Sequence, residues 1–239
     1  MKCILLCAGY ATRMYPLTEN FPKPLLEIKG KVLIDYLIDD LENNQLIEEY
    51  VIVSNHKFIN HFTDWKNNHK YSNKITILDD GSTNNDNRLG AVKDIWFAVE
   101  KENINDDILV LAGDNLLDFS LKGFIDYSNI KKGNAVMRHY EDNISKLQRT
   151  GVAVIDNDER IIDMEEKPKK PKSNWAIPPF YIFKKKSLKE IKRGIEFGCN
   201  VDAPGGFIVW FCKINDVYAY EMPGKRIDIG NLEDYYKME

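Results

Sequence analysis

A chain of 239 residues, 44% of them hydrophobic and 29% charged, is long enough to bury a sizeable core without disulfide or metal crosslinks. Its formal net charge of −4 argues against a general nucleic-acid-binding protein, which would carry a basic surface. No apolar run approaches the length that spans a bilayer, so we expect neither a nucleic acid nor a membrane as partner.

The four cysteines, Cys3, Cys7, Cys199 and Cys212, form no CxxC pair. Cys3 and Cys7 lie in or just after an apolar run, which is typical of reduced, mostly buried thiols in a reducing compartment. The chain starts with a strand-like segment and no charged n-region precedes a longer apolar stretch. We therefore expect no signal peptide and a cytoplasmic location.

The first half of the chain predicts strands that alternate with helices. Apolar runs predict strands at 2–7, 49–54, 74–78 and 108–112, and helical spacing predicts helices at 32–41, 58–65 and 89–99. This alternation is typical of βαβ units and of a mostly parallel sheet covered on both faces. The expected fold class is α/β, a Rossmann-like three-layer domain.

The second half of the chain changes character. Two strands at 151–155 and 160–164 flank a turn at 156–159, and further strands are expected at 178–183 and 217–221. Helices are expected at 188–195 and 232–236, with an apolar segment at 207–212 between them. No linker or internal repeat interrupts the chain, so we predict a single domain, 1–239, with a small antiparallel elaboration.

The loop after the first predicted strand carries the strongest chemical pattern, LCAGYATRMYPLT followed by PKPL. Small residues such as Gly9 let the backbone approach a ligand, and successive backbone N–H groups can cradle an anion. Arg13 can bind phosphate oxygens through two N–H groups, and Lys23 adds a second positive charge, expected to be mobile. The pattern suits a polyphosphate, although a surface loop with solvated cations explains the same residues taken singly.

Asp114 follows the fourth strand directly, in Gly113-Asp114-Asn115. Ligands of open α/β sheets bind at the carboxyl ends of the strands, where both Asp114 and the loop after the first strand are expected. A carboxylate at this place can hold Mg²⁺, which prefers oxygen ligands and bridges phosphates. Gly-Asp after a strand is, by itself, commonly only a turn.

In order and spacing, these motifs resemble the signature of the sugar-phosphate nucleotidyltransferases, the glucose-1-phosphate thymidylyltransferase-like enzymes that make nucleotide-sugars. The resemblance runs from residue 1 to about residue 236 and implies a GT-A-like nucleotidyltransferase fold. It implies a nucleotide-binding half at 1–115 and a sugar-phosphate-binding half at 116–239. The second glycine of the family's turn is Ala11 here.

The resemblance implies the reaction as well. An oxygen of a sugar 1-phosphate attacks the α-phosphorus of a nucleoside triphosphate, pyrophosphate leaves and an NDP-sugar forms, with Mg²⁺ as cofactor. Such enzymes supply nucleotide-sugar and polysaccharide biosynthesis, and they often form dimers or tetramers, so a homo-oligomer stays open. Catalysis of such a step is mainly positioning and charge neutralisation.

The resemblance also assigns roles to residues of this chain. It implies catalytic cations at Arg13 and Lys23, Mg²⁺ ligands at Asp114 and Asp228, nucleotide-binding residues at Ala8, Gly9, Ala11, Thr12, Arg13 and Gly90, and sugar-phosphate-binding residues at Gly151, Glu166, Lys167, Asn174 and Tyr181.

Two departures from the family pattern concern the sugar pocket: Pro178-Pro179, where relatives have a small residue and glycine, and Arg226, where relatives have an aromatic or apolar residue.

Three other functions are compatible with part of the pattern. A CTP-dependent cytidylyltransferase for phosphocholine is disfavoured by Glu166-Lys167, which suits a sugar. A silent regulatory subunit would not need to keep both aspartates. A glycosyltransferase that consumes nucleotide-sugars would carry Asp-x-Asp in place of Gly113-Asp114-Asn115.

Overall fold

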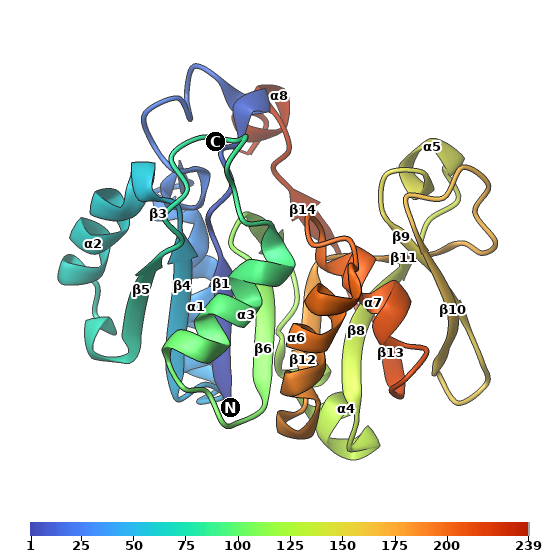
Figure 1. Ribbon diagram of the computed structural model, residues 1–239. Coiled ribbons are helices and arrows are strands. Elements are labelled where there is room, and N and C mark those ends of the chain that lie inside the picture. Colours follow the sequence, from blue (N-terminus) through green and yellow to red (C-terminus); the bar gives the residue numbers. More distant parts are fainter. Residues whose placement is uncertain (239) are drawn as a thin grey trace. The chain divides into compact units, whose positions relative to one another are not determined.

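The computed structural model describes residues 1–238, which form two compact units that interleave along the chain (Figure 1). Unit 1 comprises Met1–Leu89, Leu111–Lys122 and the chain from Gly224 on, and unit 2 comprises Gly90–Val110 and Gly123–Pro223. The predicted halves divide the chain once, after residue 115, whereas each unit takes residues from both sides of that position. The single-domain assignment stays a prediction.

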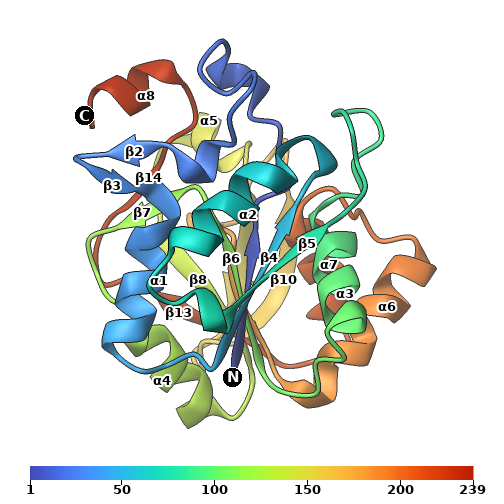
Figure 2. The same cartoon turned by 90° about the vertical axis from the view of Figure 1, so that its left-hand side faces the viewer.

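Unit 1 is built on three parallel strands, β1 (Lys2–Leu6), β4 (Glu49–Ser54) and β5 (Ile75–Asp79). β4 pairs with both β1 and β5. The centre of β1 is fully buried, which explains its unbroken apolar run. Helices α1 (Leu33–Asn43) and α2 (Ile59–Asn68) pack beside these strands (Figure 2). The predicted βαβ alternation and the α/β class are therefore confirmed.

Two short antiparallel pairs complete unit 1: β2 (Glu27–Ile28) with β3 (Lys31–Val32), and β7 (Asn115–Leu117) with β14 (Arg226–Asp228). The terminal helix α8 (Leu232–Tyr236) matches the prediction. A core cluster joins these late residues to the first third of the chain; it contains Met14, Leu26, Ile28, Leu33, Leu116, Ile229 and Tyr235. This packing holds β14 beside β7, although more than 100 residues separate them.

Unit 2 contains the predicted antiparallel elaboration. Its strands are β8 (Asn134–Tyr140), β9 (Gly151–Ile155), β10 (Ile161–Glu166), β11 (Trp175–Ile177), β12 (Phe180–Phe183) and β13 (Val217–Glu221). β8 pairs antiparallel with β11 and β12 and parallel with β13, and β9 pairs antiparallel with β10 and β11. β6 (Ile108–Ala112) runs from unit 2 into unit 1 along the chain.

The helices of unit 2 are α3 (Ala91–Lys101), α5 (Ile144–Leu147), α6 (Leu188–Phe197) and α7 (Pro204–Phe211), and α4 (Lys122–Lys131) begins at the last residue of a unit 1 segment. α3, α6 and α7 pack against one another. Short 3₁₀ turns lie at Thr12–Met14, Lys23–Leu25, His56–Phe58, Ser72–Lys74 and Lys185–Ser187.

Several predicted boundaries differ from the structure by one to three residues, and two of these differences have a clear physical cause. The strand expected from residue 178 begins at Phe180, because prolines lack the N–H that a strand ladder needs. Phe180 N–H donates instead to the carbonyl of Pro178, at 2.8 Å. The apolar segment at 207–212 belongs to α7, whose first residue, Pro204, is well placed to start a helix.

All four cysteines are free; Cys3 and Cys7 are buried, and Cys199 and Cys212 are partly buried. Within residues 1–238, every helix is too short or too polar to span a bilayer.

Candidate functional site

The loop after β1 is held open by side chains from outside its glycine turn. The amide of the fully buried Asn55 donates to the carbonyl of Ala8 at 3.0 Å, and the hydroxyl of Thr18 donates to the carbonyl of Ala11 at 2.9 Å. A Cβ built on Gly9 would meet nothing within 4 Å, so this backbone is open to a ligand. Ala11 adopts a left-handed conformation (φ 46°, ψ 39°), which glycine would adopt without strain.

This loop forms one wall of a cavity of about 320 Å³ within unit 1. Residues that line the cavity include Gly9, Tyr10, Ala11, Thr12, Arg13, Met14, Lys23, Pro24, Asn85, Arg88, Asp114 and Gly230. Most of the predicted nucleotide-binding residues therefore share one cavity. Arg13 is exposed there and forms no hydrogen bond or ion pair with any other residue that the structure describes, so its guanidinium is available to a ligand.

Lys23 is placed differently from the prediction of a mobile charge. Its side chain is only 8% exposed, and its ammonium lies 2.8 Å from Oδ2 of Asp114 and 3.8 Å from Oδ1 of Asp228. The expectation of mobility was wrong because Lys23 lies in a buried 3₁₀ turn, Lys23–Leu25, beside two carboxylates. The structure does bring together the two aspartates that the sequence placed 114 residues apart.

Asn115 and Arg226 connect the same carboxylates from the other side. Asp228 pairs with Asn115 in the β7–β14 register. The amide of Asn115 donates to Oδ1 of Asp114 at 2.9 Å, and its oxygen accepts from the guanidinium of Arg226 at 2.7 Å. That guanidinium also lies 3.6 Å from Oδ2 of Asp228. Arg226, which the sequence analysis noted only as a departure that concerns the sugar pocket, is therefore part of the acidic site.

The acidic pair has the donor chemistry that a divalent cation needs. Asp114 and Asp228 converge on one positive group, the Lys23 ammonium, which occupies the kind of position that a cation would take. Mg²⁺ sites commonly use one or two carboxylates and complete their shell with water and substrate phosphates. Residues 1–238 contain no cluster of three or more His, Cys, Asp or Glu side chains that could hold a metal.

Cys7 lies under this site but is not a nucleophile. Burial raises the pKa of the Cys7 thiol well above its usual range, and the nearby charge of Asp114 raises it further. A Cβ on Gly113 would lie 2.6 Å from the Cys7 sulfur, so glycine is needed there for β6 to lead into Asp114. A neutral, buried thiol packs the site and does not attack phosphorus.

In unit 2, the carboxylate of Glu166 rests over two glycines. A Cβ on Gly205 would overlap a Glu166 carboxylate oxygen, and a Cβ on Gly151 would lie 3.1 Å from it. Burial raises the pKa of Glu166, and the charge of Lys167 partly offsets this. No residue in the described range 1–238 gives this carboxylate a hydrogen bond, so both oxygens are available as acceptors.

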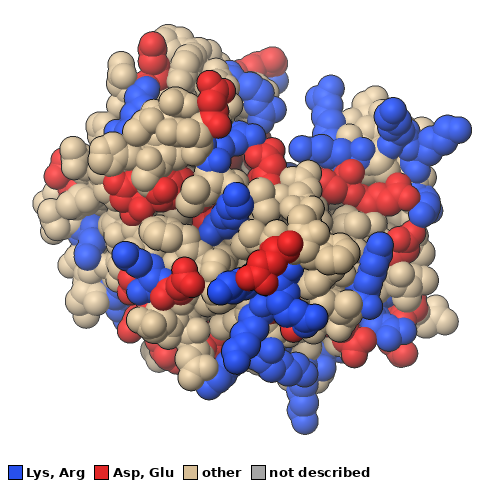
Figure 3. Space-filling view, in the orientation of Figure 1, with Lys and Arg blue, Asp and Glu red and all other residues tan. Residues whose placement is uncertain are grey.

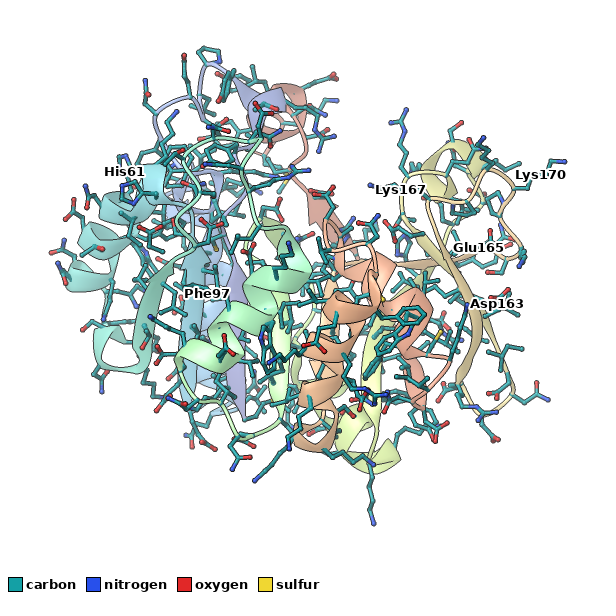
Figure 4. All side chains as sticks on the ribbon, viewed as in Figure 1. His61, Phe97, Asp163, Glu165, Lys167 and Lys170 are labelled. Carbon is teal, nitrogen blue, oxygen red and sulfur yellow. The ribbon has the colours of Figure 1, made fainter. Side chains whose placement is uncertain are left out.

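The neighbouring charges of β10 have a different environment. Glu165 points to the other face of the strand and pairs with Lys172 at 2.8 Å, as does Asp163 at 2.7 Å. Lys167 is exposed and, in Figure 4, projects away from the strands, as does Lys170. Figure 3 shows Lys and Arg side chains gathered over this part of unit 2. Lys167 is therefore available to an anion.

The other predicted residues of unit 2 have structural contacts. The amide of Asn174 donates to the carbonyl of Glu141 at 2.8 Å, and Tyr181 is 2% exposed and stacked on Phe183 with ring centroids 6.2 Å apart. Gly90 (φ 91°) starts α3, and a Cβ there would lie 2.7 Å from the carbonyl oxygen of Val201. Their roles as ligand-binding residues stay predictions.

The sequence analysis gave no role to five residues that shape the unit 1 site. Asn55 and Asn115 carried a signal, since each is a polar residue directly after or at the start of a strand. Arg226 was noted only as a departure. Asn85 and Arg88, which line the cavity and hydrogen-bond to each other at 3.0 Å, lie in a loop whose course no periodic pattern predicts.

Comparison with known proteins identifies the family of this chain. The model of the nucleotidyl transferase family matches residues 2–239. The bifunctional protein GlmU of Methanococcus aeolicus is 38% identical over 241 residues, covering 98% of this chain and 52% of that protein. A glucose-1-phosphate adenylyltransferase of Fervidobacterium nodosum is 28% identical over 246 residues, covering 98% of this chain and 59% of that protein. The chain thus spans little more than half the length of these curated relatives.

Among solved structures, UDP-glucose pyrophosphorylase complexed with UDP-glucose matches with a TM-score of 0.82 and 23% identity, over 99% of this chain and 96% of that one. At this identity the likeness concerns the fold alone, and it confirms the expected GT-A-like nucleotidyltransferase fold.

Proposed function

Because this chain belongs to the nucleotidyl transferase family, we propose that it transfers a nucleotidyl group from a nucleoside triphosphate to a sugar 1-phosphate, giving an NDP-sugar and pyrophosphate. The observation that carries the proposal is the unit 1 cavity, where an open loop, an arginine with no partner among residues 1–238, and Asp114 meet. Lys23, which also lines the cavity, lies between Asp114 and Asp228.

The triphosphate binds in this cavity. The backbone from Gly9 to Arg13 offers N–H groups to phosphate oxygens, and Gly9 lets them come close because it lacks a Cβ. Arg13 binds the departing β- and γ-phosphates through its unpaired guanidinium. The strained backbone of Ala11 is stabilised by the hydrogen bond from Thr18, which keeps the loop in its open form before the ligand arrives.

Members of the family generally use a divalent metal ion, and we propose Mg²⁺ held by Asp114 and Asp228. When bound, Mg²⁺ would supply positive charge that offsets the charge of the phosphates. The Lys23 ammonium then exchanges its carboxylate partners for phosphate oxygens. The protein thus keeps its acidic pair neutralised before the ligand binds and turns a cation toward phosphate afterwards.

The sugar 1-phosphate binds to unit 2 through Glu166 and Lys167. Glu166 accepts hydrogen bonds from sugar hydroxyls, because no donor among residues 1–238 competes with them for its half-buried carboxylate. Lys167 is exposed and pairs with the phosphate. A neutral hydroxylated ring suits a carboxylate acceptor, and this supports a sugar over choline, whose cation would need an aromatic cage.

The reaction needs no side-chain nucleophile. An oxygen of the sugar 1-phosphate forms the new bond to the α-phosphorus, and the bond to the bridging oxygen of pyrophosphate breaks. Arg13 and Lys23 neutralise the charge that accumulates on the leaving group, and the transfer runs in both directions. The four free cysteines support a reducing compartment such as the cytoplasm, where the product would serve nucleotide-sugar and polysaccharide biosynthesis.

Pyrophosphate release tests the proposal, measured with Mg²⁺ across ATP, GTP, CTP, UTP and dTTP combined with a panel of sugar 1-phosphates and phosphocholine. We expect release that requires one triphosphate and one sugar phosphate together. Release with phosphocholine and CTP alone would replace the sugar by choline. No release by folded protein would contradict the enzymatic function and favour the silent subunit.

A further inference from the structure

Five side chains of unit 1 form a closed ring. The Lys23 ammonium lies 2.8 Å from Asp114 Oδ2, whose partner oxygen accepts from Asn115 at 2.9 Å. The Asn115 oxygen accepts from Arg226 at 2.7 Å, and the Arg226 guanidinium lies 3.6 Å from Asp228 Oδ2. Oδ1 of Asp228 closes the ring, 3.8 Å from Lys23. Each carboxylate oxygen therefore faces a donor or a cation.

The ring balances its own charge. Its two carboxylates are matched by one ammonium and one guanidinium, whose side chains are only 8% and 19% exposed. A divalent cation that joined this ring without phosphate would leave two excess positive charges in a partly buried place, where water and salt screen them incompletely. The side-chain cations therefore oppose the entry of the ion until a polyphosphate accompanies it.

We propose that Arg226 is a positioning residue that serves as a resident counter-cation of the acidic pair. It holds Asp228 directly and Asp114 through the Asn115 amide, and it weakens the binding of a divalent cation to the nucleotide-free protein. The inference rests on the proposed function only where that function makes Asp114 and Asp228 the ligands of the cation.

Mn²⁺ binding to the nucleotide-free full chain tests this role, with free Mn²⁺ measured by electron spin resonance. Arg226→Gln keeps a donor for Asn115 but removes the charge, so Mn²⁺ should bind about tenfold more tightly than to the wild type. Arg226→Lys keeps the charge and should bind within about twofold of the wild type. The matched control is Lys225→Gln, which removes one charge from an exposed neighbour outside the ring and should also change affinity by less than about twofold. Circular dichroism checks the folding of each variant.

Three results would overturn the inference: affinity in Arg226→Gln no higher than in the wild type, an equal gain in Arg226→Lys, or an equal gain in Lys225→Gln. The proposed function fails separately. If adding Asp228→Asn to Arg226→Gln leaves the Mn²⁺ affinity unchanged, the acidic pair is not the ligand, and both the metal assignment and the counter-cation role fall. If the wild type releases pyrophosphate but Arg226→Gln gains no affinity, only the counter-cation role is wrong.

Discussion

The two units treat their charged groups in opposite ways. In unit 1, Lys23 and Arg226 are already paired with Asp114 and Asp228, so a ligand must exchange partners with side chains that are bound to each other. In unit 2, Glu166 has a half-buried carboxylate that accepts no hydrogen bond from the part of the chain that the structure describes. The first arrangement keeps a site neutral until a highly charged ligand arrives, and the second leaves acceptors ready for neutral hydroxyls.

The difference has a physical cause. A metal–triphosphate brings several charges of both signs, so pairs inside the protein can be replaced one for one. A sugar hydroxyl brings no charge and cannot displace a salt bridge, so its acceptor has to be left free. Substitutions in unit 1 should therefore act through charge exchange, and those in unit 2 through the shape that exposes one carboxylate.

The largest effect is expected for Asp114→Asn. The amide cannot supply the charge that a divalent cation needs, so the rate of pyrophosphate release should fall by roughly 100-fold or more. Folding should be retained, because the amide oxygen still accepts from Lys23. Asp64→Asn, the same change on an exposed position of α2, should have no effect. Near-normal Mg²⁺-dependent activity in Asp114→Asn would contradict the proposal that ligands of unit 1 bind by replacing its ion pairs.

The second largest effect is expected for Gly205→Ala in unit 2. The new Cβ would overlap the Glu166 carboxylate, which is the flexible end of a side chain and can move away. We expect KM for the sugar 1-phosphate to rise about tenfold, while alanine within α7 keeps or improves stability. Steady-state kinetics with each substrate varied in turn checks this. A rise in KM for the triphosphate alone would break the assignment of Glu166 to the sugar.

Ala11→Gly should stabilise the loop of unit 1. Alanine in the left-handed region costs about 1–2 kcal/mol, and the greater freedom of glycine in the unfolded chain returns part of this, which leaves a gain of about 0.5–1 kcal/mol. Urea unfolding measures it. Ala203→Gly, at an ordinary φ of −123°, is the matched substitution and should lose stability. A loss in both variants would mean that Ala11 is not strained.

The smallest effect concerns the pH dependence of stability at Glu166. Burial raises the pKa of Glu166 from 4.5, so the folded protein disfavours the ionised form. The wild type therefore loses this part of its stability as pH rises from the unfolded pKa through the folded one. Glu166→Gln should melt about 1–3 °C higher than the wild type at pH 7 and equally at pH 4.

Glu165→Gln is the control for that pH profile. Glu165 forms an ion pair with Lys172, so its negative charge stabilises the folded protein. The variant should show no increase in melting temperature at pH 7. An increase equal to that of Glu166→Gln would indicate a general effect of removing negative charge, and the distinction between the two neighbouring carboxylates would be lost.

Much of the fold was predictable because its signals are local. Continuous apolar runs gave the strands at Glu49–Ser54 and Ile108–Ala112 with their observed bounds, and helical spacing indicated α1 and α6. β8 was missed, although its first four residues are buried and it pairs with three other strands. Its sequence, NAVMRHY, neither alternates nor runs apolar for long, so its strand structure depends on its neighbours.

The site residues that directly follow a predicted strand could be predicted from the sequence. Those that depend on the pairing of two short strands could not. Gly9, Arg13 and Asp114 follow long apolar runs, and they line one cavity. The ring of Arg226 and Asn115 depends on the pairing of two three-residue strands, β7 and β14, which are too short to show a period. Their pairing follows from the packing of Ile229 and Leu116 in one core cluster, which only the folded chain reveals.

The central claim is that the nucleotidyl group passes to a sugar 1-phosphate and not to water, so that one phosphorus–oxygen bond to the sugar phosphate forms for each bond to pyrophosphate that breaks. Phosphorus-31 NMR of the wild type with Mg²⁺, the active triphosphate and its sugar 1-phosphate tests it most directly. The account predicts that the paired resonances of a sugar diphosphate ester and the single resonance of pyrophosphate grow together in equal amounts. Pyrophosphate or orthophosphate that appears without the sugar diphosphate would mean hydrolysis and would contradict the account.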